Sequence, residues 1–74
     1  MEQLKQILME INDQIDYAVE TELLSAGLLD SVQLVELVAA LEEEYGIEIP
    51  LDEIEPDNFD SIEAIFNMIQ RVKQ

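Results

Sequence analysis

Residues 27–46 read GLLDSVQLVELVAALEEEYG and predict a turn followed by an amphipathic helix with a marked start and a marked end. Asp30 is a good N-cap residue, and Gln33, three positions later, completes a pair similar to a capping box. Gly46 supplies the C-terminal stop. About 15 residues at 1.5 Å per residue predict a rod of roughly 22 Å. Its apolar stripe recurs at helical spacing and consists of Leu34, Leu37, Val38, Leu41 and Tyr45.

Ser31 stands at the first turn of this helix. A serine at a helix start is usually only a cap, but Asp30 already fills that position, so the Ser31 hydroxyl is predicted to point outward. Amide groups at a helix N-terminus favour an anion, so a phosphate ester on Ser31 would be stabilised there. The chain has no histidine, no cysteine and no Gly-x-Ser-x-Gly elbow around Ser31. A serine hydroxyl without a base is a poor nucleophile. We therefore expect that Ser31 is modified by another protein and that the chain is not an enzyme.

Periodic apolar residues also predict a first amphipathic helix over about residues 2–16. Residues 17–29 follow as a long connection, and connections of this length without regular structure are often functional. Gly27 suits a turn because glycine tolerates positive φ. The first helix is expected to bury Leu4, Ile7, Leu8, Ile11 and Ile15, and the connection to pack back onto the core through Val19, Leu23, Leu24, Leu28 and Leu29.

The segment after Gly46 predicts an extended link over residues 47–50, a short turn of helix over residues 51–54 ended by Pro56, and a last helix from near Ser61. Asp60 can cap that last helix, with Glu63 at the capping-box position. Its buried face is expected to consist of Ile62, Ile65, Phe66, Ile69 and Val72. The predicted fold class is all-α: a small bundle of three main helices plus one short helix, in a single domain over residues 1–74.

The composition combines a core-forming share of apolar residues, 49%, with 18 acidic and 3 basic residues, a net charge of -15. Such a surface repels nucleic acid and anionic lipid, and it favours protein partners with basic patches. The start of the chain lacks the features of a signal peptide, and no apolar run is long enough to span a membrane, so a cytoplasmic protein is expected. The chain is also expected to be a monomer. An acidic cluster in the C-terminal half consists of Asp52, Glu53, Glu55, Asp57 and Asp60. It lacks the glycine of a calcium loop and is interpreted as a solvated connection, so no metal site is expected.

The residues from Asp30 to Pro50, with matching helix order on either side, resemble the acyl carrier protein family. The resemblance implies that a phosphopantetheinyl transferase moves 4'-phosphopantetheine from coenzyme A onto Ser31. It also implies that the terminal thiol then carries an acyl or aminoacyl group as a thioester. Asp30 would help to position the transferase's metal and substrate. The partner-docking face would contain Val32, Val35 and Glu36.

The chain departs from the usual family pattern at Val32, where leucine is common, and at Gln33, where an acidic residue is common. The Gly-Leu-Leu-Asp-Ser form resembles D-alanyl carrier proteins and carriers of dedicated pathways. The expected function is an acyl carrier that delivers its cargo to biosynthetic enzymes, as in lipid or fatty acid synthesis. Its expected partners are the transferase, a loading enzyme, and a downstream acyltransferase or synthase with basic docking patches. A D-alanyl or other aminoacyl carrier is the alternative, and an acidic protein that mimics nucleic-acid charge is a more distant one.

Overall fold

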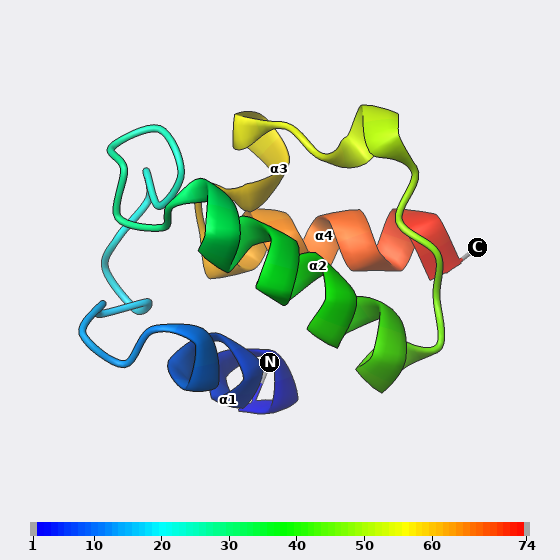
Figure 1. Ribbon diagram of the computed structural model, residues 1–74, viewed down its shortest axis with the longest axis horizontal. Coiled ribbons are helices and arrows are strands. Elements are labelled where there is room, and N and C mark those ends of the chain that lie inside the picture. Colours follow the sequence, from blue (N-terminus) through cyan, green and yellow to red (C-terminus); the bar gives the residue numbers. More distant parts are fainter. Residues whose placement is uncertain (1, 74) are drawn as a thin grey trace.

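Four α-helices and one short 3₁₀ helix make up the regular structure of the computed structural model, which describes residues 2–73 (Figure 1). In chain order they are α1 (Glu2–Ile11), α2 (Ser31–Tyr45), η1 (Leu51–Glu53), α3 (Pro56–Phe59) and α4 (Ile62–Lys73). Only α1, α2 and α4 are longer than one or two turns, which confirms the predicted all-α bundle with three main helices. Met1 and Gln74, the ends of the expected single domain, lie outside the described residues.

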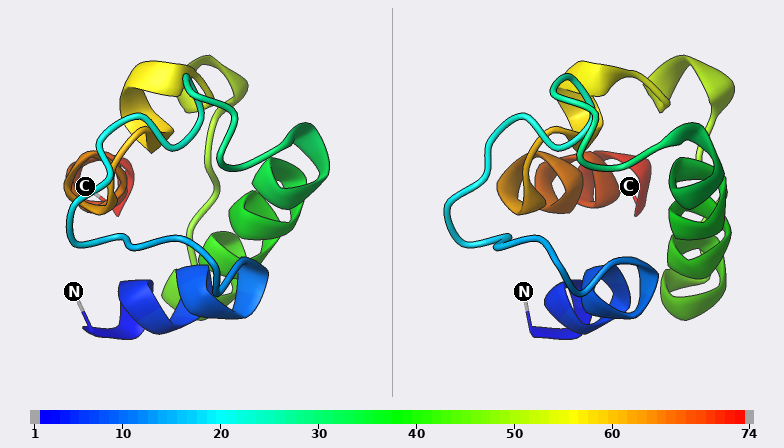
Figure 2. Two further views of the ribbon diagram at one scale, coloured as in Figure 1. Left: turned by 90° about the vertical axis from the view of Figure 1, so that its left-hand side faces the viewer. Right: turned by 60° about the vertical axis from the view of Figure 1, so that its left-hand side comes forward.

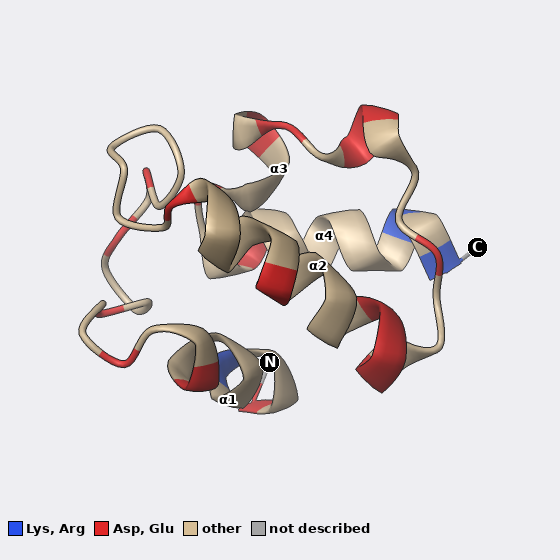
Figure 3. Cartoon of the chain, viewed as in Figure 1, with Lys and Arg blue, Asp and Glu red and all other residues tan. Residues whose placement is uncertain are grey.

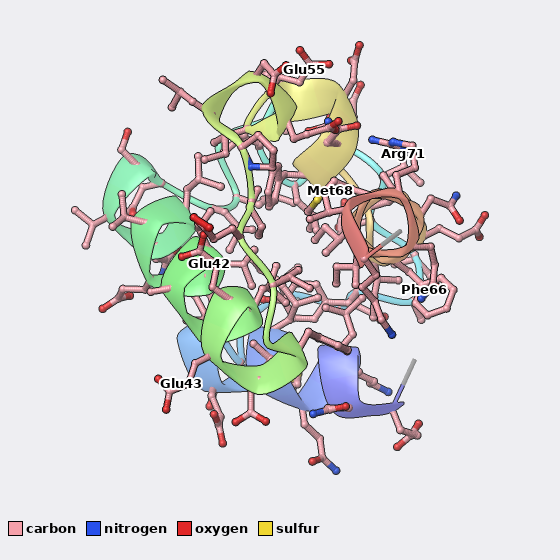
Figure 4. All side chains as sticks on the ribbon, turned by 90° about the vertical axis from the view of Figure 1, so that its right-hand side faces the viewer. Glu42, Glu43, Glu55, Phe66, Met68 and Arg71 are labelled. Atoms are coloured by element: carbon pink, nitrogen blue, oxygen red, sulfur yellow. The ribbon has the colours of Figure 1, made fainter. Side chains whose placement is uncertain are left out.

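The helices surround one apolar core (Figure 2). α1 packs against α2 and α4, and α3 packs against α4. Met68 points between the helices into this core (Figure 4). Within the described residues no charged side chain is buried, so the acidic groups all lie at the surface. The largest fully buried side chains are Phe59, Leu4, Leu8, Leu23, Leu29, Leu37, Leu41, Ile65, Met68 and Ile69.

Both predicted ends of α2 are confirmed. Asp30 Oδ1 accepts a hydrogen bond from Gln33 N at 2.8 Å, and Gln33 Oε1 accepts one from Asp30 N at 3.3 Å, which closes the capping box. At the other end Gly46 adopts φ +64°, a conformation that favours glycine, and its N–H donates to the Glu42 carbonyl. The predicted stripe faces the core: Leu37 and Leu41 are fully buried, and the other three members are half-buried.

The prediction that the first helix extends to residue 16 is wrong, because α1 ends at Ile11. Asn12 Oδ1 accepts a hydrogen bond from Gln14 N, a local turn that competes with helix. The Tyr17 hydroxyl lies 2.7 Å from the Asn12 carbonyl oxygen and 3.0 Å from that of Leu8, and so satisfies the end of α1. Burial raises the pKa of Tyr17, and the nearby Asp13 carboxylate raises it further. Ile15 still packs against the core from outside the helix.

The connection between α1 and α2 behaves only partly as predicted. It contains turns but no helix and crosses the end of the bundle at which α2 begins (Figure 2). Leu23 and Leu29 are buried and Leu24 is half-buried, as expected. The prediction for Val19 and Leu28 is wrong: both are exposed, and neither is among the side chains that pack against the core.

Two predictions for the C-terminal third are also wrong in detail. Pro56 does not simply end the preceding turn, since it is the first residue of α3, a position that needs no backbone N–H. Asp60 does not cap α4: the Ser61 hydroxyl accepts from Ala64 N at 3.0 Å instead. Glu63 therefore does not occupy the capping-box position, which falls on Ala64. The link, the turn at η1 and the start of α4 near Ser61 agree with the sequence. Of the expected buried face, Ile65 and Ile69 are fully buried, and Ile62, Phe66 and Val72 are half-buried.

Acidic side chains are spread over the helices and connections, while the basic ones lie on α1 and at the C-terminal end of α4 (Figure 3). The net charge of -15 makes these surface charges repel one another. Salt screens such repulsion, with a Debye length of about 8 Å at physiological ionic strength. We therefore expect the melting temperature, followed by circular dichroism, to rise with added NaCl or Mg²⁺. A flat or falling melting temperature would contradict the repulsion argument.

None of the helices within residues 2–73 combines the length and the apolar character needed to cross a membrane.

Candidate functional site

Ser31 is the first residue of α2, and its side chain is exposed. The cap of this helix is Asp30, in extended backbone conformation, with its carboxylate bonded to Gln33 N. The Asp30 carbonyl oxygen accepts from Leu34 N at 2.9 Å, so the first helical bonds also form without the serine side chain. The structure thus confirms that capping is not the role of Ser31. The Ser31 hydroxyl is therefore not used by the helix, and it lies exposed at the positive end of a 15-residue helix.

The loop before Ser31 closes on itself. Leu29 N donates to the Leu23 carbonyl at 2.9 Å, and Gly27 N donates to the Leu24 carbonyl at 3.1 Å. Gly27 has φ +77°, which confirms the expected turn and explains the glycine. Buried Leu23 and Leu29 pin both ends of the loop to the core. Ser31 therefore follows directly on an anchored segment.

Asp60, which precedes α4, also reaches this loop. Its carboxylate accepts hydrogen bonds from Leu24 N, Ser25 N and the Ser25 hydroxyl. Partial burial raises the pKa of Asp60, but these three hydrogen bonds outweigh it and leave the pKa below its ordinary value. Sequence reasoning missed this contact because Asp60 and Ser25 are 35 positions apart and Asp60 stands where a helix cap is normally found.

The predicted docking residues come together beside Ser31. Val32 and Val35 are each 68% exposed, which is high for large apolar side chains. Glu36, also exposed, lies one helical turn after Val32 on the same face of α2. Exposed apolar residues that adjoin a charged one are typical of protein-interaction surfaces.

An apolar groove of about 420 Å³ runs along α2 from one turn beyond Ser31. Its first members, Leu34 and Val35, share the helix face of Ser31 because they stand three and four positions after it. Leu51 of η1 is 84% exposed and forms part of its other wall. Only the fold brings η1 to α2, so the sequence did not reveal this groove. Its lining consists of Leu34, Val35, Val38, Ala39, Glu42, Leu51 and Ile54.

The acidic segment over residues 52–60 is only partly the solvated connection that the sequence predicts, because Glu53 and Asp60 bond to other parts of the protein. Glu53 forms an ion pair with Arg71 at 2.8 Å, and Asn58 bonds to both partners. Arg71 extends from the C-terminal part of α4 (Figure 4). Exposed pairs of this kind contribute only about 0–1 kcal/mol to stability. The part of the chain that the structure describes contains no cluster of three or more His, Cys, Asp or Glu side chains that could hold a metal ion.

A small helical bundle that exposes a serine at the start of its second long helix is consistent with the class of carrier proteins. The chain matches the family model for the phosphopantetheine attachment site over residues 2–69 and belongs to this family. The cofactor of the family is 4'-phosphopantetheine, attached covalently. The exposed Ser31 hydroxyl, which the helix does not need for capping, fits such an attachment.

The curated relatives that the chain resembles include D-alanyl carrier proteins. That of Bacillus velezensis is 32% identical over 69 residues, which cover 90% of this chain and 88% of the relative. That of Listeria monocytogenes is 31% identical over 74 residues, covering 97% and 95%. That of Streptococcus pyogenes is 26% identical over 61 residues, covering 82% and 77%. The similarity therefore extends over about three quarters or more of the length of each of these carriers.

Proposed function

We propose that Ser31 bears the 4'-phosphopantetheine arm and that the chain carries a substrate on this arm between enzymes. The observation that supports this most directly is the exposed hydroxyl at the first position of α2, beside a cap that is already filled by Asp30. The other two serines have structural roles: Ser25 donates to Asp60, and Ser61 caps α4. Ser31 is therefore the serine best placed for modification.

In the proposed attachment, Ser31 Oγ forms the new phosphate ester bond, and the pyrophosphate bond of coenzyme A breaks. The adenosine bisphosphate part of coenzyme A leaves, and the serine proton passes to a base of the transferase. The chain contains no histidine that could take this proton. The amide groups at the start of α2 stabilise the phosphate negative charge on Ser31. Asp30, next to Ser31 and exposed, would meet a metal ion bound by the transferase, as its adjacent position supports.

The bound arm supplies a terminal thiol, which forms a thioester with the cargo. This chain contains no cysteine of its own. Its own residues contribute the attachment point and the docking surface, and the reactions belong to the enzymes that it visits. An acidic mimic of nucleic acid would need no modified serine, so the family match favours the carrier over that alternative.

Intact-mass spectrometry tests the attachment. The purified apo chain is incubated with coenzyme A, Mg²⁺ and a phosphopantetheinyl transferase of broad specificity. We expect the mass to increase by one phosphopantetheine group, and to stay unchanged when coenzyme A is omitted. An unchanged mass in the complete reaction would contradict the proposed function.

For the cargo, D-alanine is the first candidate. The sequence alone ranks a general acyl group first, but the relatives named D-alanyl carrier proteins, at 26–32% identity, favour the aminoacyl alternative. Loading of the arm-bearing chain by an adenylating enzyme, with D-alanine, L-alanine and a fatty acid in parallel, separates these cargoes. We expect a D-alanyl thioester, and exclusive loading of the fatty acid would reject it.

A short acyl chain is the second candidate, because the groove beside Ser31 is lined almost entirely by apolar side chains. An acyl group on the arm would remove its own apolar surface from water by lying there. Nuclear magnetic resonance (NMR) of the acylated chain would then show shift changes at Val38 and Ala39. Changes confined to residues next to Ser31 would count against this cargo site.

Glu36→Lys is expected to weaken loading by the cognate enzyme. The substitution reverses the charge beside the exposed Val32 and Val35, where an enzyme with a basic patch would dock. We expect KM for the chain to rise about tenfold at low salt with kcat little changed, and the effect to shrink as salt is added. Glu63→Lys, the same charge change on α4, is the control and should leave KM within about twofold. Equal effects of the two variants would contradict a docking role for Glu36.

A further inference from the structure

We infer that Asp60 is a positioning residue for arm attachment: it holds the loop before Ser31 in the conformation that the transferase recognises. The inference rests on the proposed attachment at Ser31. Asp60 contacts neither the arm nor the reacting hydroxyl, and it acts through the loop alone. Nothing in its sequence context, directly before the Ser61 cap of α4, suggests such a role.

The contact is extensive for one residue. Asp60 Oδ1 accepts from Leu24 N at 3.0 Å and from Ser25 N at 2.8 Å, and Oδ2 accepts from the Ser25 hydroxyl at 2.6 Å. The Asp60 backbone carbonyl also accepts from Leu23 N at 2.8 Å. Three successive residues of the loop are thus bonded to one residue in the short connection between α3 and α4. Hydrogen bonds that involve a carboxylate are among the stronger ones in proteins.

A short chain of contacts connects this point to Ser31. Leu23, bonded to the Asp60 carbonyl, accepts through its own carbonyl from Leu29 N. Leu29 is buried, and Ser31 follows two residues later. The position of the loop relative to the bundle, and with it the approach to the start of α2, therefore depends on Asp60.

Two backbone hydrogen bonds shape the tip of the loop, from Ala26 N to the Glu22 carbonyl and from Gly27 N to the Leu24 carbonyl, but both lie within the loop and do not attach it to the bundle. Residues 25–28 are exposed, so the core holds the loop only through the flanking Leu23, Leu24 and Leu29. Holding exposed backbone in one conformation costs entropy for every residue. The carboxylate offsets this cost where apolar burial cannot. Without it we expect several loop conformations, of which only a fraction suits the transferase.

This expectation predicts which kinetic constant changes. When only a fraction of the molecules has the loop conformation that the transferase recognises, the apparent affinity of the transferase for the protein falls in proportion to that fraction. The chain that does bind then reacts normally. For Asp60→Ala we expect KM of the transferase for the apo chain to rise about tenfold, with kcat within about twofold of wild type. Ser25→Ala keeps the carboxylate and two backbone bonds, so a rise of about threefold is expected.

Two further variants separate positioning from charge and from folding. Asp60→Asn keeps an oxygen acceptor for the two amides and should restore KM to near wild type. Asp57→Ala removes the same charge from an exposed site three residues away and should leave KM unchanged. Hydrogen exchange measured by NMR reports the contact itself. In Asp60→Ala the Leu24 and Ser25 amides should lose protection, while amides inside α2 keep theirs.

The outcomes separate this inference from the proposed function. If wild type gains no arm, the proposed function fails. If wild type gains the arm and Asp60→Ala reacts with the wild-type KM although its loop amides exchange freely, only the positioning inference is overturned. If circular dichroism shows that Asp60→Ala is unfolded, Ser25→Ala decides: a raised KM in a folded chain supports the inference, and an unchanged KM overturns it.

Discussion

Ser31→Ala is expected to abolish attachment of 4'-phosphopantetheine, so that the mass of the chain stays unchanged after incubation with coenzyme A and transferase. The substitution removes the oxygen that would form the phosphate ester and leaves the rest of the surface as it is. Because Asp30 caps α2 and Ser31 is exposed, the free energy of unfolding should change by no more than about 0.5 kcal/mol. The loss of arm attachment would then result from the missing hydroxyl and not from a change in folding.

The chain supplies its own controls in its two other serines, Ser25 and Ser61. Ser25→Ala and Ser61→Ala should both still gain the arm, the first with a moderately raised KM. Ser61→Ala also loses the α4 cap, which should cost about 1 kcal/mol of stability. Arm attachment to Ser31→Ala, or its loss in a folded Ser61→Ala, would reject Ser31 as the attachment site.

Leu37→Ala is expected to remove about 2–5 kcal/mol from the free energy of unfolding. Leu37 is fully buried on α2, so its truncation loses apolar burial and leaves a cavity in the core. Domains of this size are often only marginally stable, with total stabilities near the lower part of the usual range of about 5–15 kcal/mol. The melting temperature, followed by circular dichroism, should fall by at least about 8 °C.

Leu51→Ala is the matched control because it deletes the same atoms from a side chain that is 84% exposed. Its effect on stability should stay within about 0.5 kcal/mol. Equal losses of stability in the two variants would contradict the burial of Leu37 in the core. Leu51 also lines the groove beside α2, so this variant can later show whether the groove contacts cargo without a change in folding.

Much of α2 could be predicted from the chain because its signals are local. The capping box joins residues three positions apart, the stop is a glycine directly after the helix, and the apolar stripe follows the helical period. Ser31, Val32, Val35 and Glu36 share this helix, so their common exposed face also followed from spacing. The same reasoning failed at α1, where a tyrosine hydroxyl from outside the helix contributes to its end.

Local pattern thus determined that three main helices form, where α2 begins and ends, and which serine is exposed at its start, since these features depend on residues a few positions apart. Tertiary structure alone decided that Asp60 bonds the loop before Ser31 and not its own helix. It also decided that Leu51 meets α2 and that Val19 and Leu28 face solvent. These outcomes depend on contacts between distant segments. Asp60 could either cap the following helix or bond the distant loop, and these two arrangements differ by only a few hydrogen bonds. The packing of the whole bundle decides between them.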